Sequence, residues 1–408
     1  MKKNLVQLAM SIVLLVLLSK AVYAQWVQTN GPFGKNVFAI AASGSNVIAG
    51  TSGGLYLTVN KGTNWTEISD GLPANAFVEA LATSGSQDVF AGTYDGGVFR
   101  SINNGASWIA VNSGLNSHDI VSIAVGGNSI FASTNDSNVF QSINNGTSWS
   151  KVNSSFTNKI VLSFAINGGN IFAGTNGDGV FRSTNNGATW VGVNEGFDWD
   201  KIAYSFALNG GNIFAGTANG VYLSTNDGTN WAAVDSGLPW NTPIRSIAVS
   251  GNQELFAGID NEVFLSTNSG ITWKKTNFPD RLMSLAVIGD TVFVGTIVNG
   301  VWRRPISEMT GGVNSSSKHC LKQGGFRIHA PSNGTSIATI GFLLQHPDHV
   351  TINIYNPSGK KIASFFNTTL GSGSYCLPWN TRKIAAGTYL VRGQIGSNTV
   401  VANIPICH

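Results

Sequence analysis

The chain has few charged residues. Lys, Arg, Asp and Glu make up 11% of its 408 residues, where a typical soluble domain has about a quarter. Histidine is also scarce, and His118 is the only one between residues 25 and 305. Imidazole metal sites need several histidines close together, and a Ser-His-Asp triad needs one beside a nucleophile. We therefore expect no metal site and no cofactor.

Cysteine is nearly absent. The three cysteines, Cys320, Cys376 and Cys407, all follow residue 305. An exported protein can hold one disulfide, and an odd count leaves one thiol over. Their spacing matches no zinc site, and the pairing among the three stays open.

Long hydrophobic runs are absent except at the N-terminus. Leu5 to Leu18 form an apolar stretch too short to span a bilayer comfortably, Lys2 and Lys3 precede it, and Val22-Tyr23-Ala24 suits a signal peptidase. We expect residues 1–24 to be a signal peptide cleaved after Ala24. The mature protein would then be secreted or at the cell surface, without a transmembrane segment. The alternative is an uncleaved membrane anchor.

Charge divides the chain into two blocks of opposite sign. Residues 25–305 carry 13 Lys/Arg and 18 Asp/Glu, a formal charge of −5. Residues 306–408 carry 8 Lys/Arg and 2 Asp/Glu, a formal charge of +6. Opposite blocks favour two domains. A negative first domain without basic runs argues against nucleic acid as its ligand.

Glycine, by contrast, is abundant, with 49 residues, and much of it belongs to an internal repeat of about 41 residues. Tryptophans recur at intervals of 41 to 43 residues, and each ends a tract of the form Ser/Thr-x-Asn-x-Gly-x-Ser/Thr/Asn-Trp. They are Trp65, Trp108, Trp149, Trp190, Trp231 and Trp273. Short apolar alternations bounded by Gly and Asn predict four strands in each unit.

The repeat count predicts how the structure closes. First, second and third strands each occur seven times, but no further tryptophan-ended tract follows Arg304. The missing fourth strand is at the other end, since Trp26 to Asn30 matches Trp273 to Asn277. We expect Trp26 to Asn30 to be the outer strand of the last blade, which joins both ends of the ring and removes an open edge.

The tryptophan-ended tract resembles the Asp-box, or bacterial neuraminidase repeat. This repeat occurs in sialidases, sortilin-like receptors, xyloglucanases and photosystem II assembly factor-like propellers. The resemblance covers about 280 residues and implies an all-β, seven-bladed β-propeller. The family's central Asp is Asn here, at Asn103, Asn144, Asn185, Asn226 and Asn268. Asn can still accept hydrogen bonds from the turn, with Gly at positive φ, so we expect a structural role.

The C-terminal segment contains a second set of motifs. These are the strand and turn of Val350 to Ile362, a Gly373 to Asn380 segment that includes Trp379, and an Ala-Gly-x-Tyr stretch from Ala386 to Arg392. In this order they resemble the C-terminal sorting domains of type IX-secreted proteins and an immunoglobulin-like domain of the flagellar hook-cap protein. Asn356 replaces the family's usual Asp, and Val401 to His408 lacks its basic end. The resemblance implies a β-sandwich recognised by secretion machinery; a spacer or adhesion sandwich is the alternative.

Four segments follow from these observations. They are a signal peptide (1–24), a seven-bladed propeller (25–305), a Ser- and Gly-rich linker (306–325) and an immunoglobulin-like β-sandwich (326–408).

Candidate ligand residues are expected on connections that vary over the repeated frame. Trp199 and Trp240 stand outside the repeat pattern, and Asp198 and Asp200 flank Trp199. Exposed aromatic rings there would suit stacking on a sugar or gripping a peptide. Alternatively, both tryptophans pack on the blades. Acids in the second-to-third-strand turns are expected to be turn formers rather than a site that attracts a cation or a basic peptide: Asp95, Asp136, Asp178 and Asp260.

One inner-strand position suggests a pocket. It holds Glu79, Tyr204 and Arg245 in three repeats and apolar residues in the other four, namely Phe38, Val121, Leu162 and Met283. A Glu79–Arg245 ion pair is conceivable, although their two repeats are not neighbours in the ring.

The main functional hypothesis is a non-enzymatic binding module for a glycan or a protein. Glycoside hydrolysis normally needs two carboxylates across the scissile bond, for which Asp198, Asp200 and Glu79 are the only nominees. The chain lacks the arginine set of the sialidase relatives, and xyloglucanases place their carboxylates between two propellers. A glycoside hydrolase is thus the alternative, and an assembly factor for a membrane complex is the second alternative.

Overall fold

A computed structural model describes residues 25–85, 87–127, 129–152, 156, 159–197, 201–250, 254–310, 326–329, 337–344, 348–370, 373–381 and 384–406. Except for the short helix α2 (Ile306–Thr310), its described elements are β-strands. The predicted signal peptide, Cys320 and Cys407 lie outside the described residues, as does the side chain of Cys376, so the disulfide pairing stays a prediction.

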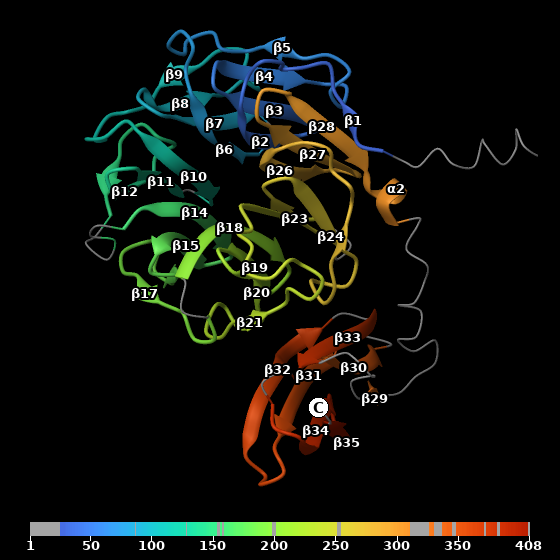
Figure 1. Ribbon diagram of the computed structural model, residues 1–408. Helices are drawn as coiled ribbons and strands as arrows, with labels where there is room; N and C mark the ends of the chain where they lie inside the picture. The colour runs from blue at the N-terminus through green and yellow to red at the C-terminus, as the bar shows by residue number, and fades with distance from the viewer. Residues whose placement is uncertain are drawn as a thin grey trace, which may run out of the picture.

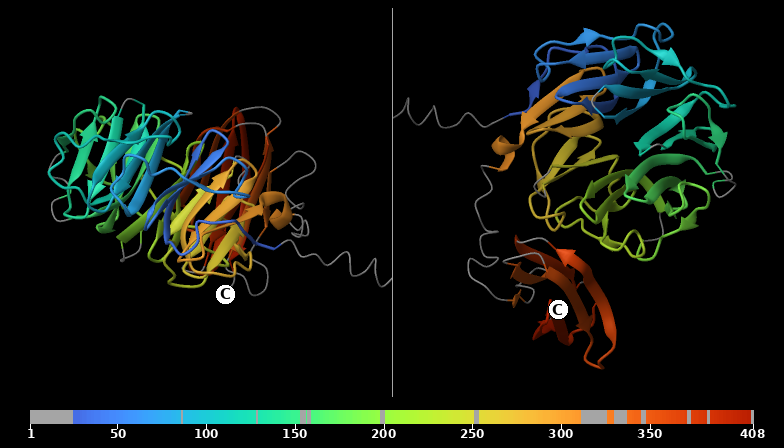
Figure 2. Two further views of the ribbon diagram at one scale, coloured as in Figure 1. Left: turned by 90° about the horizontal axis from the view of Figure 1, so that it is seen from above. Right: turned by 180° about the vertical axis from the view of Figure 1, so that it is seen from behind.

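Residues 26–305 form seven blades arranged in a ring (Figure 1), which Figure 2 also shows from behind. The first four blades are β2 (Val37–Ser43), β3 (Asn46–Thr51), β4 (Gly54–Thr58), β5 (Thr66–Glu67); β6 (Val78–Ser84), β7 (Asp88–Thr93), β8 (Gly97–Ser101), β9 (Ile109–Ala110); β10 (Ile120–Gly126), β11 (Ser129–Thr134), β12 (Val139–Ser142), β13 (Ser150–Lys151); and β14 (Val161–Asn167), β15 (Asn170–Gly177), β16 (Val180–Ser183), β17 (Val191–Gly192). The last three are β18 (Lys201–Asn209), β19 (Asn212–Thr217), β20 (Gly220–Ser224), β21 (Ala232–Ala233); β22 (Ser246–Val249), β23 (Leu255–Ile259), β24 (Glu262–Ser266), β25 (Lys274–Lys275); and β26 (Leu282–Ile288), β27 (Thr291–Thr296), β28 (Val301–Pro305), β1 (Val27–Gln28).

The hydrophobic core lies between neighbouring blades. Each inner strand contacts the inner strand of the next blade, and β26 contacts β2, so the ring is closed. The phenylalanine of the repeated Phe-Ala/Val segment on the second strand is fully buried in six blades: Phe90, Phe131, Phe172, Phe214, Phe256 and Phe293. In the first blade Ile48 takes its place and packs with Val78 and Val89 of the second. Aromatic and β-branched residues suit these half-buried strand faces.

The seventh blade is completed by the N-terminal strand, as the repeat count predicts. β1 pairs antiparallel with β28, opposing Val27 to Arg303 and Gln28 to Trp302. In Figure 1 the blue β1 lies beside the orange β28 at the junction of the two chain ends. Trp26 occupies the position of the repeat tryptophan and is buried against Phe278.

The repeat tryptophans link consecutive blades. In four blades the indole Nε1 donates to a carbonyl oxygen at the end of the preceding blade's outer strand: Trp108 to Ile68, Trp149 to Val111, Trp231 to Val193 and Trp273 to Val234, at 2.7–2.8 Å. Trp190 differs from these four and donates to Gly187 within its own turn. These tryptophans are buried, which confirms that they pack between sheets.

The turn that precedes each tryptophan is held by its own Ser and Asn. In the second blade, Ser101 Oγ accepts from Gly105 N at 2.8 Å, and Asn103 Oδ1 accepts from Ser107 N at 3.0 Å. Gly105 has φ +89°, a conformation that glycine adopts readily. Equivalent bonds hold the turns at Asn144, Asn185, Asn226 and Asn268. Asn therefore forms the turn as expected.

The segment after the last blade differs from the prediction. We expected a linker from residue 306, but Ile306–Thr310 form α2, and Met309 is buried in the same cluster as Trp26 and Phe278. The propeller therefore extends to residue 310. An apolar i, i+3 pair, Ile306 and Met309, gives the helix a buried side.

The C-terminal domain is a two-sheet β-sandwich. One sheet has the order β29 (Phe326–His329), β30 (Ile337–Leu344), β33 (Gly373–Asn380), and the other β32 (Lys361–Leu370), β31 (Asp348–Tyr355), β34 (Gly387–Ile395), β35 (Asn398–Ile406). Alternate residues of β30, β31, β34 and β35 meet in one core, as expected for packed sheets. Trp379 and Tyr389, both from the sequence motifs, pack edge to face with ring centroids 5.3 Å apart. Asn356 Oδ1 accepts from Lys360 N at 2.9 Å and thus forms the turn without the family's Asp.

Candidate functional site

The variable connections and the second-to-third-strand turns lie on one face of the ring, which we call the loop face. Backbone hydrogen bonds join the two sets within each blade: Tyr94 N donates to Phe77 O at 3.0 Å, and Asn135 N donates to Asp119 O at 3.1 Å. The tryptophan-ended turns lie on the opposite face, because strands alternate in direction. The loop face is therefore built from the least repetitive parts of the chain.

The inner-strand position singled out in the sequence is a β-bulge in six blades. The register of the inner strand shifts at this residue, between its two neighbours, in β2, β6, β10, β14, β18 and β26. Arg245, the seventh, immediately precedes β22. A bulge turns one side chain away from the regular alternation, and all seven side chains remain partly or fully exposed near the loop face. The sequence located this position but gave no sign of the bulge.

Tyr204 and Arg245 come together across two blades. The Arg245 guanidinium carbon lies 5.5 Å from the centroid of the Tyr204 ring, a cation–π geometry. Arg245 also forms an ion pair with Asp260 at 2.9 Å. The conceivable Glu79–Arg245 pair is therefore wrong: Arg245 is paired with the acid of its own blade.

Glu79 instead belongs to a group of acids over the second and third blades, the acidic patch (Glu79, Asp95, Asp119 and Asp136). Burial raises the pKa of the Glu79 carboxyl, and the charge of Asp119 raises it further. The pKa of Asp119 is also raised, mainly by burial; a hydrogen bond from Asn135 opposes this, and the charges of Asp136 and Asp95 add to it. Burial and like charges both disfavour ionised carboxylates. The patch therefore concentrates negative charge.

Asp136 is the member of the acidic patch held most firmly in its charged form. Burial acts to raise the pKa of Asp136, but hydrogen bonds with Thr134, Asn138 and Ser117 outweigh it and hold that pKa below its usual range. The carboxylate bonds to Thr134 Oγ1 two residues before it, which agrees with its expected role in the turn. Asp178 forms an ion pair with the Lys159 side chain, and Asp260 forms one with the Arg245 side chain.

Trp240 is exposed rather than packed. Its side chain is 86% accessible, so the packing alternative is wrong for this residue. Asp198, Trp199 and Asp200 lie outside the described residues, and their role stays a prediction.

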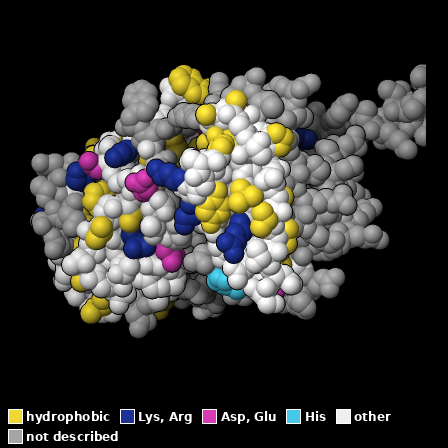
Figure 3. All heavy atoms as spheres, turned by 90° about the horizontal axis from the view of Figure 1, so that it is seen from below, with side chains coloured by type: hydrophobic (Ala, Val, Ile, Leu, Met, Phe, Trp, Pro, Cys, Tyr) yellow, Lys and Arg dark blue, Asp and Glu magenta, His cyan; other side chains and the backbone are white. Residues whose placement is uncertain are grey.

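Other aromatic side chains on the loop face were missed by the sequence reasoning. Among the described residues, the exposed large aromatic side chains are Phe33 (55%), Phe77 (46%), Tyr94 (52%) and Trp240, and all four stand on the loop face. Their positions in variable connections were the available signal. Figure 3 shows the molecule from below, where Lys and Arg side chains, a few Asp and Glu side chains and groups of hydrophobic side chains stand among white atoms.

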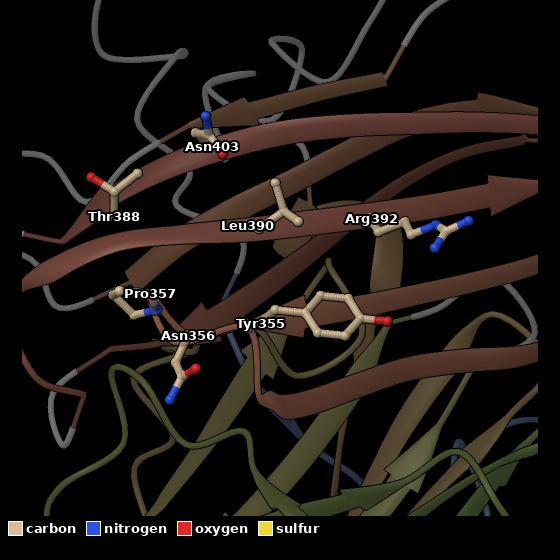
Figure 4. Close-up of a pocket in the computed structure, with 8 residues that line it drawn as sticks. Tyr355, Asn356, Pro357, Thr388, Leu390, Arg392 and Asn403 are labelled. Atoms are coloured by element: carbon tan, nitrogen blue, oxygen red, sulfur yellow. The ribbon is translucent and has the colours of Figure 1, made fainter.

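Two hollows complete the description. One, of about 480 Å³, borders the first two blades and has a polar lining that includes Lys35, Tyr56, Glu67 and Asp70. The other, of about 400 Å³, lies on the outer face of the sandwich. In Figure 4 its Tyr355 and Arg392 side chains extend in the same direction from β31 and β34, and Leu390 lies beside Arg392 on β34. Sequence reasoning proposed neither.

The described residues contain no helix long and apolar enough to cross a membrane. Within the same residues, no group of three His, Cys, Asp or Glu side chains is arranged to hold a metal ion.

Comparison with known proteins places the fold. No protein-family model matches the chain, and no curated protein matches it. The solved structure "YCF48 bound to D1 peptide" is similar with a TM-score of 0.57 and 15% identity, over 70% of this chain and 96% of that one. Another similar structure is PorZ, a bacterial surface component of the type IX secretion system of Porphyromonas gingivalis. Its TM-score is 0.52 at 16% identity, over 94% of this chain and 61% of that one. A GH74 xyloglucanase from Xanthomonas campestris is similar with a TM-score of 0.59 and 14% identity, over 92% of this chain and 75% of that one. At these identities the likeness shows a β-propeller fold.

Proposed function

We propose that this chain is an exported, non-enzymatic recognition module whose loop face binds a protein or glycan ligand at the cell surface or outside the cell. The observation that carries the proposal is the concentration of exposed aromatic side chains, Phe33, Phe77, Tyr94 and Trp240, on that face. Large aromatic side chains contribute much of the binding energy in protein interfaces and also stack on sugars. The repeated frame holds them on short connections between rigid strands.

The similar structures support this reading. One is a YCF48 propeller with a bound peptide, and another is a surface component of a secretion system. The C-terminal sandwich would then serve as a sorting domain for the type IX secretion machinery. An assembly factor for a membrane complex is a more specific form of the same proposal, which co-purification of the partner complex would test.

The mature chain, residues 25–408, tests the proposal on glycan arrays and a peptide library. A double Phe77→Ala, Trp240→Ala variant should lose at least about tenfold in affinity for any ligand found, because truncating an aromatic hot-spot residue costs an interface about 2 kcal/mol or more. Ile102→Ala with Ile143→Ala, which removes exposed apolar side chains on the opposite face, is the matched control. Equal losses in both variants, or no binding by the parent, would overturn the proposal.

A glycoside hydrolase is the second candidate, and the raised pKa values of Glu79 and Asp119 favour it. Glycosidases use two carboxylates, one of them kept protonated to act as an acid. Release of reducing sugar from plant or microbial polysaccharides, abolished by Glu79→Gln, would establish the hydrolase over the binding module. The absence of turnover with binding retained would exclude it.

A further inference from the structure

We propose that the loop face over the first three blades binds an extended peptide segment of a protein partner, and that this segment carries an aromatic or long aliphatic side chain next to two or more Lys or Arg residues. The inference rests on the proposed function and specifies its ligand. It follows from two groups of side chains that lie next to each other: the aromatic patch (Phe38, Phe77 and Tyr94) and the acidic patch.

The aromatic patch contains a pair of neighbouring rings and a tyrosine whose backbone is bonded to that pair. Phe38, the bulge residue of β2, and Phe77, which precedes β6, have ring centroids 6.3 Å apart. The Tyr94 backbone is bonded to that of Phe77 at 3.0 Å. Phe77 and Tyr94 are about half exposed, at 46% and 52%. The apolar surface of such exposed rings is removed from water only when another molecule covers it.

The acidic patch continues directly from the aromatic patch. Asp95 follows Tyr94, and Glu79 lies two residues after Phe77 on β6. The charge of Asp119 acts on Glu79, and those of Asp95 and Asp136 act on Asp119. Asp119 is thus close enough to interact with each of the other three acids, and Glu79 and Asp95 lie next to Phe77 and Tyr94 along the chain.

The acids of this patch differ from the other turn acids of the loop face. Asp178 pairs with Lys159, and Asp260 pairs with Arg245. Within the described part of the chain, no Lys or Arg forms an ion pair with any of the four acids of the acidic patch. A cationic ligand would supply the missing counter-charge, and desolvated pairs of this kind give both specificity and fast association.

The combination selects a peptide over other ligands. Nucleic acid is repelled by clustered carboxylates, and a neutral sugar gains nothing from their charge. Lys and Arg side chains can bind the carboxylates and also lie over the Phe and Tyr rings. A neighbouring apolar side chain of the same peptide can then pack on the aromatic patch.

The test begins with selection of random 12-residue peptides displayed on phage against the immobilised mature chain. A selected peptide, labelled with fluorescein, is then titrated by fluorescence anisotropy. We expect enrichment of peptides that combine aromatic residues with Lys or Arg, and an affinity that falls as salt is raised. Phe77→Ala and the double variant Glu79→Gln, Asp119→Asn should each weaken binding at least about tenfold.

Matched controls separate a local effect from a general one. Ile102→Ala and Asp227→Asn remove an exposed apolar side chain and an exposed acid on the opposite face, and they should leave the affinity unchanged. Tyr94→Ser provides a second exposed position should Phe77→Ala disturb folding, as checked by circular dichroism.

The possible outcomes distinguish the inference from the proposed function. Peptides without basic residues, or binding that Trp240→Ala abolishes and Phe77→Ala does not affect, would overturn the inference while the recognition function stands. Binding to glycans alone would also overturn it. If neither peptides nor glycans bind the mature chain, the proposed function itself fails.

Discussion

The indole Nε1 of Trp26 donates a hydrogen bond of 3.1 Å to Oγ1 of Thr276, 250 residues further along the chain. This contact joins the seventh blade to the sixth in the way that other repeat tryptophans join their blades. On the other side, Trp65 Nε1 of the first blade donates to Thr29 Oγ1 at 3.0 Å. The junction between the two chain ends therefore uses the same indole donor as the continuous parts of the ring, with a threonine hydroxyl as the acceptor in place of a backbone carbonyl.

Trp26→Ala should destabilise the propeller by about 3 to 5 kcal/mol, the usual cost of deleting a buried tryptophan. The substitution removes the bond to Thr276 and the edge contact with Phe278, whose ring centroid lies 5.1 Å away. Chemical denaturation of the mature chain, followed by intrinsic fluorescence and circular dichroism, measures the change in the free energy of unfolding.

Val27→Ala is the control for this prediction, because Val27 lies on the same strand but is 51% exposed. It should change stability by less than about 0.5 kcal/mol. Deleting residues 26–30 should be more damaging than deleting five residues from the C-terminal sandwich, which has its own core. Unchanged unfolding after the deletion would contradict closure of the ring by β1.

The connections between blades contain a glycine that cannot be replaced. A Cβ on Gly71 would lie 2.1 Å from the carbonyl oxygen of Trp108 in the next blade, and Gly71 has φ +94°. Gly71→Ala should therefore cost both the strain of a left-handed backbone, about 1 to 2 kcal/mol, and about 1 to 3 kcal/mol for the steric overlap. Denaturant unfolding measures the sum.

Gly85→Ala isolates the first of these costs. Gly85 also has positive φ, +69°, but a Cβ there meets no atom within 4 Å. Gly85→Ala should destabilise the protein only by the strain of the left-handed backbone, so Gly71→Ala should be the more damaging of the two. Equal losses would show that the close approach to Trp108 relaxes without cost.

Much of the fold could be predicted from the sequence, because the repeat makes each strand visible several times. The spacing of the tryptophans gave the blades, and the match of Trp26 to Trp273 gave the closure. Helix α2 was missed because five residues carry too little periodicity to stand out from a Ser- and Gly-rich segment.

The loop face was predictable as a location but not as an arrangement. Glu79 and Arg245 were found because they depart from an apolar position, yet their partners, Asp119 and Asp260, come from loops whose conformation the repeat does not specify. Exposure of Trp240 likewise depends on how one connection folds. Variation in sequence indicates where function is expected, whereas the partners of a charged residue across loops can be identified only from the three-dimensional structure.

Ionised Glu79 should destabilise the propeller at neutral pH but not in mild acid. Burial and the charge of Asp119 raise the folded-state pKa of Glu79 above the ordinary value of 4.5. Above both pKa values, the folded protein therefore bears the cost of an unfavourable carboxylate that the unfolded chain does not. Lowering the pH through the folded-state pKa toward 4.5 protonates the group in the folded state first, so this cost disappears.

Glu79→Gln removes the charge and keeps the shape, so it should be more stable than the parent at pH 7. The difference should shrink as the pH falls and vanish below the ordinary carboxyl pKa. Asp119 and Asp136 lie in the same patch and are also ionisable, so the measured quantity is the difference between variant and parent at each pH. Denaturant unfolding of both proteins at pH 7 and in mild acid gives that difference. A variant less stable than the parent at pH 7 would mean that Glu79 has a favourable partner in the folded protein, and the acidic patch would then lack the unsatisfied charge on which recognition of a basic peptide depends.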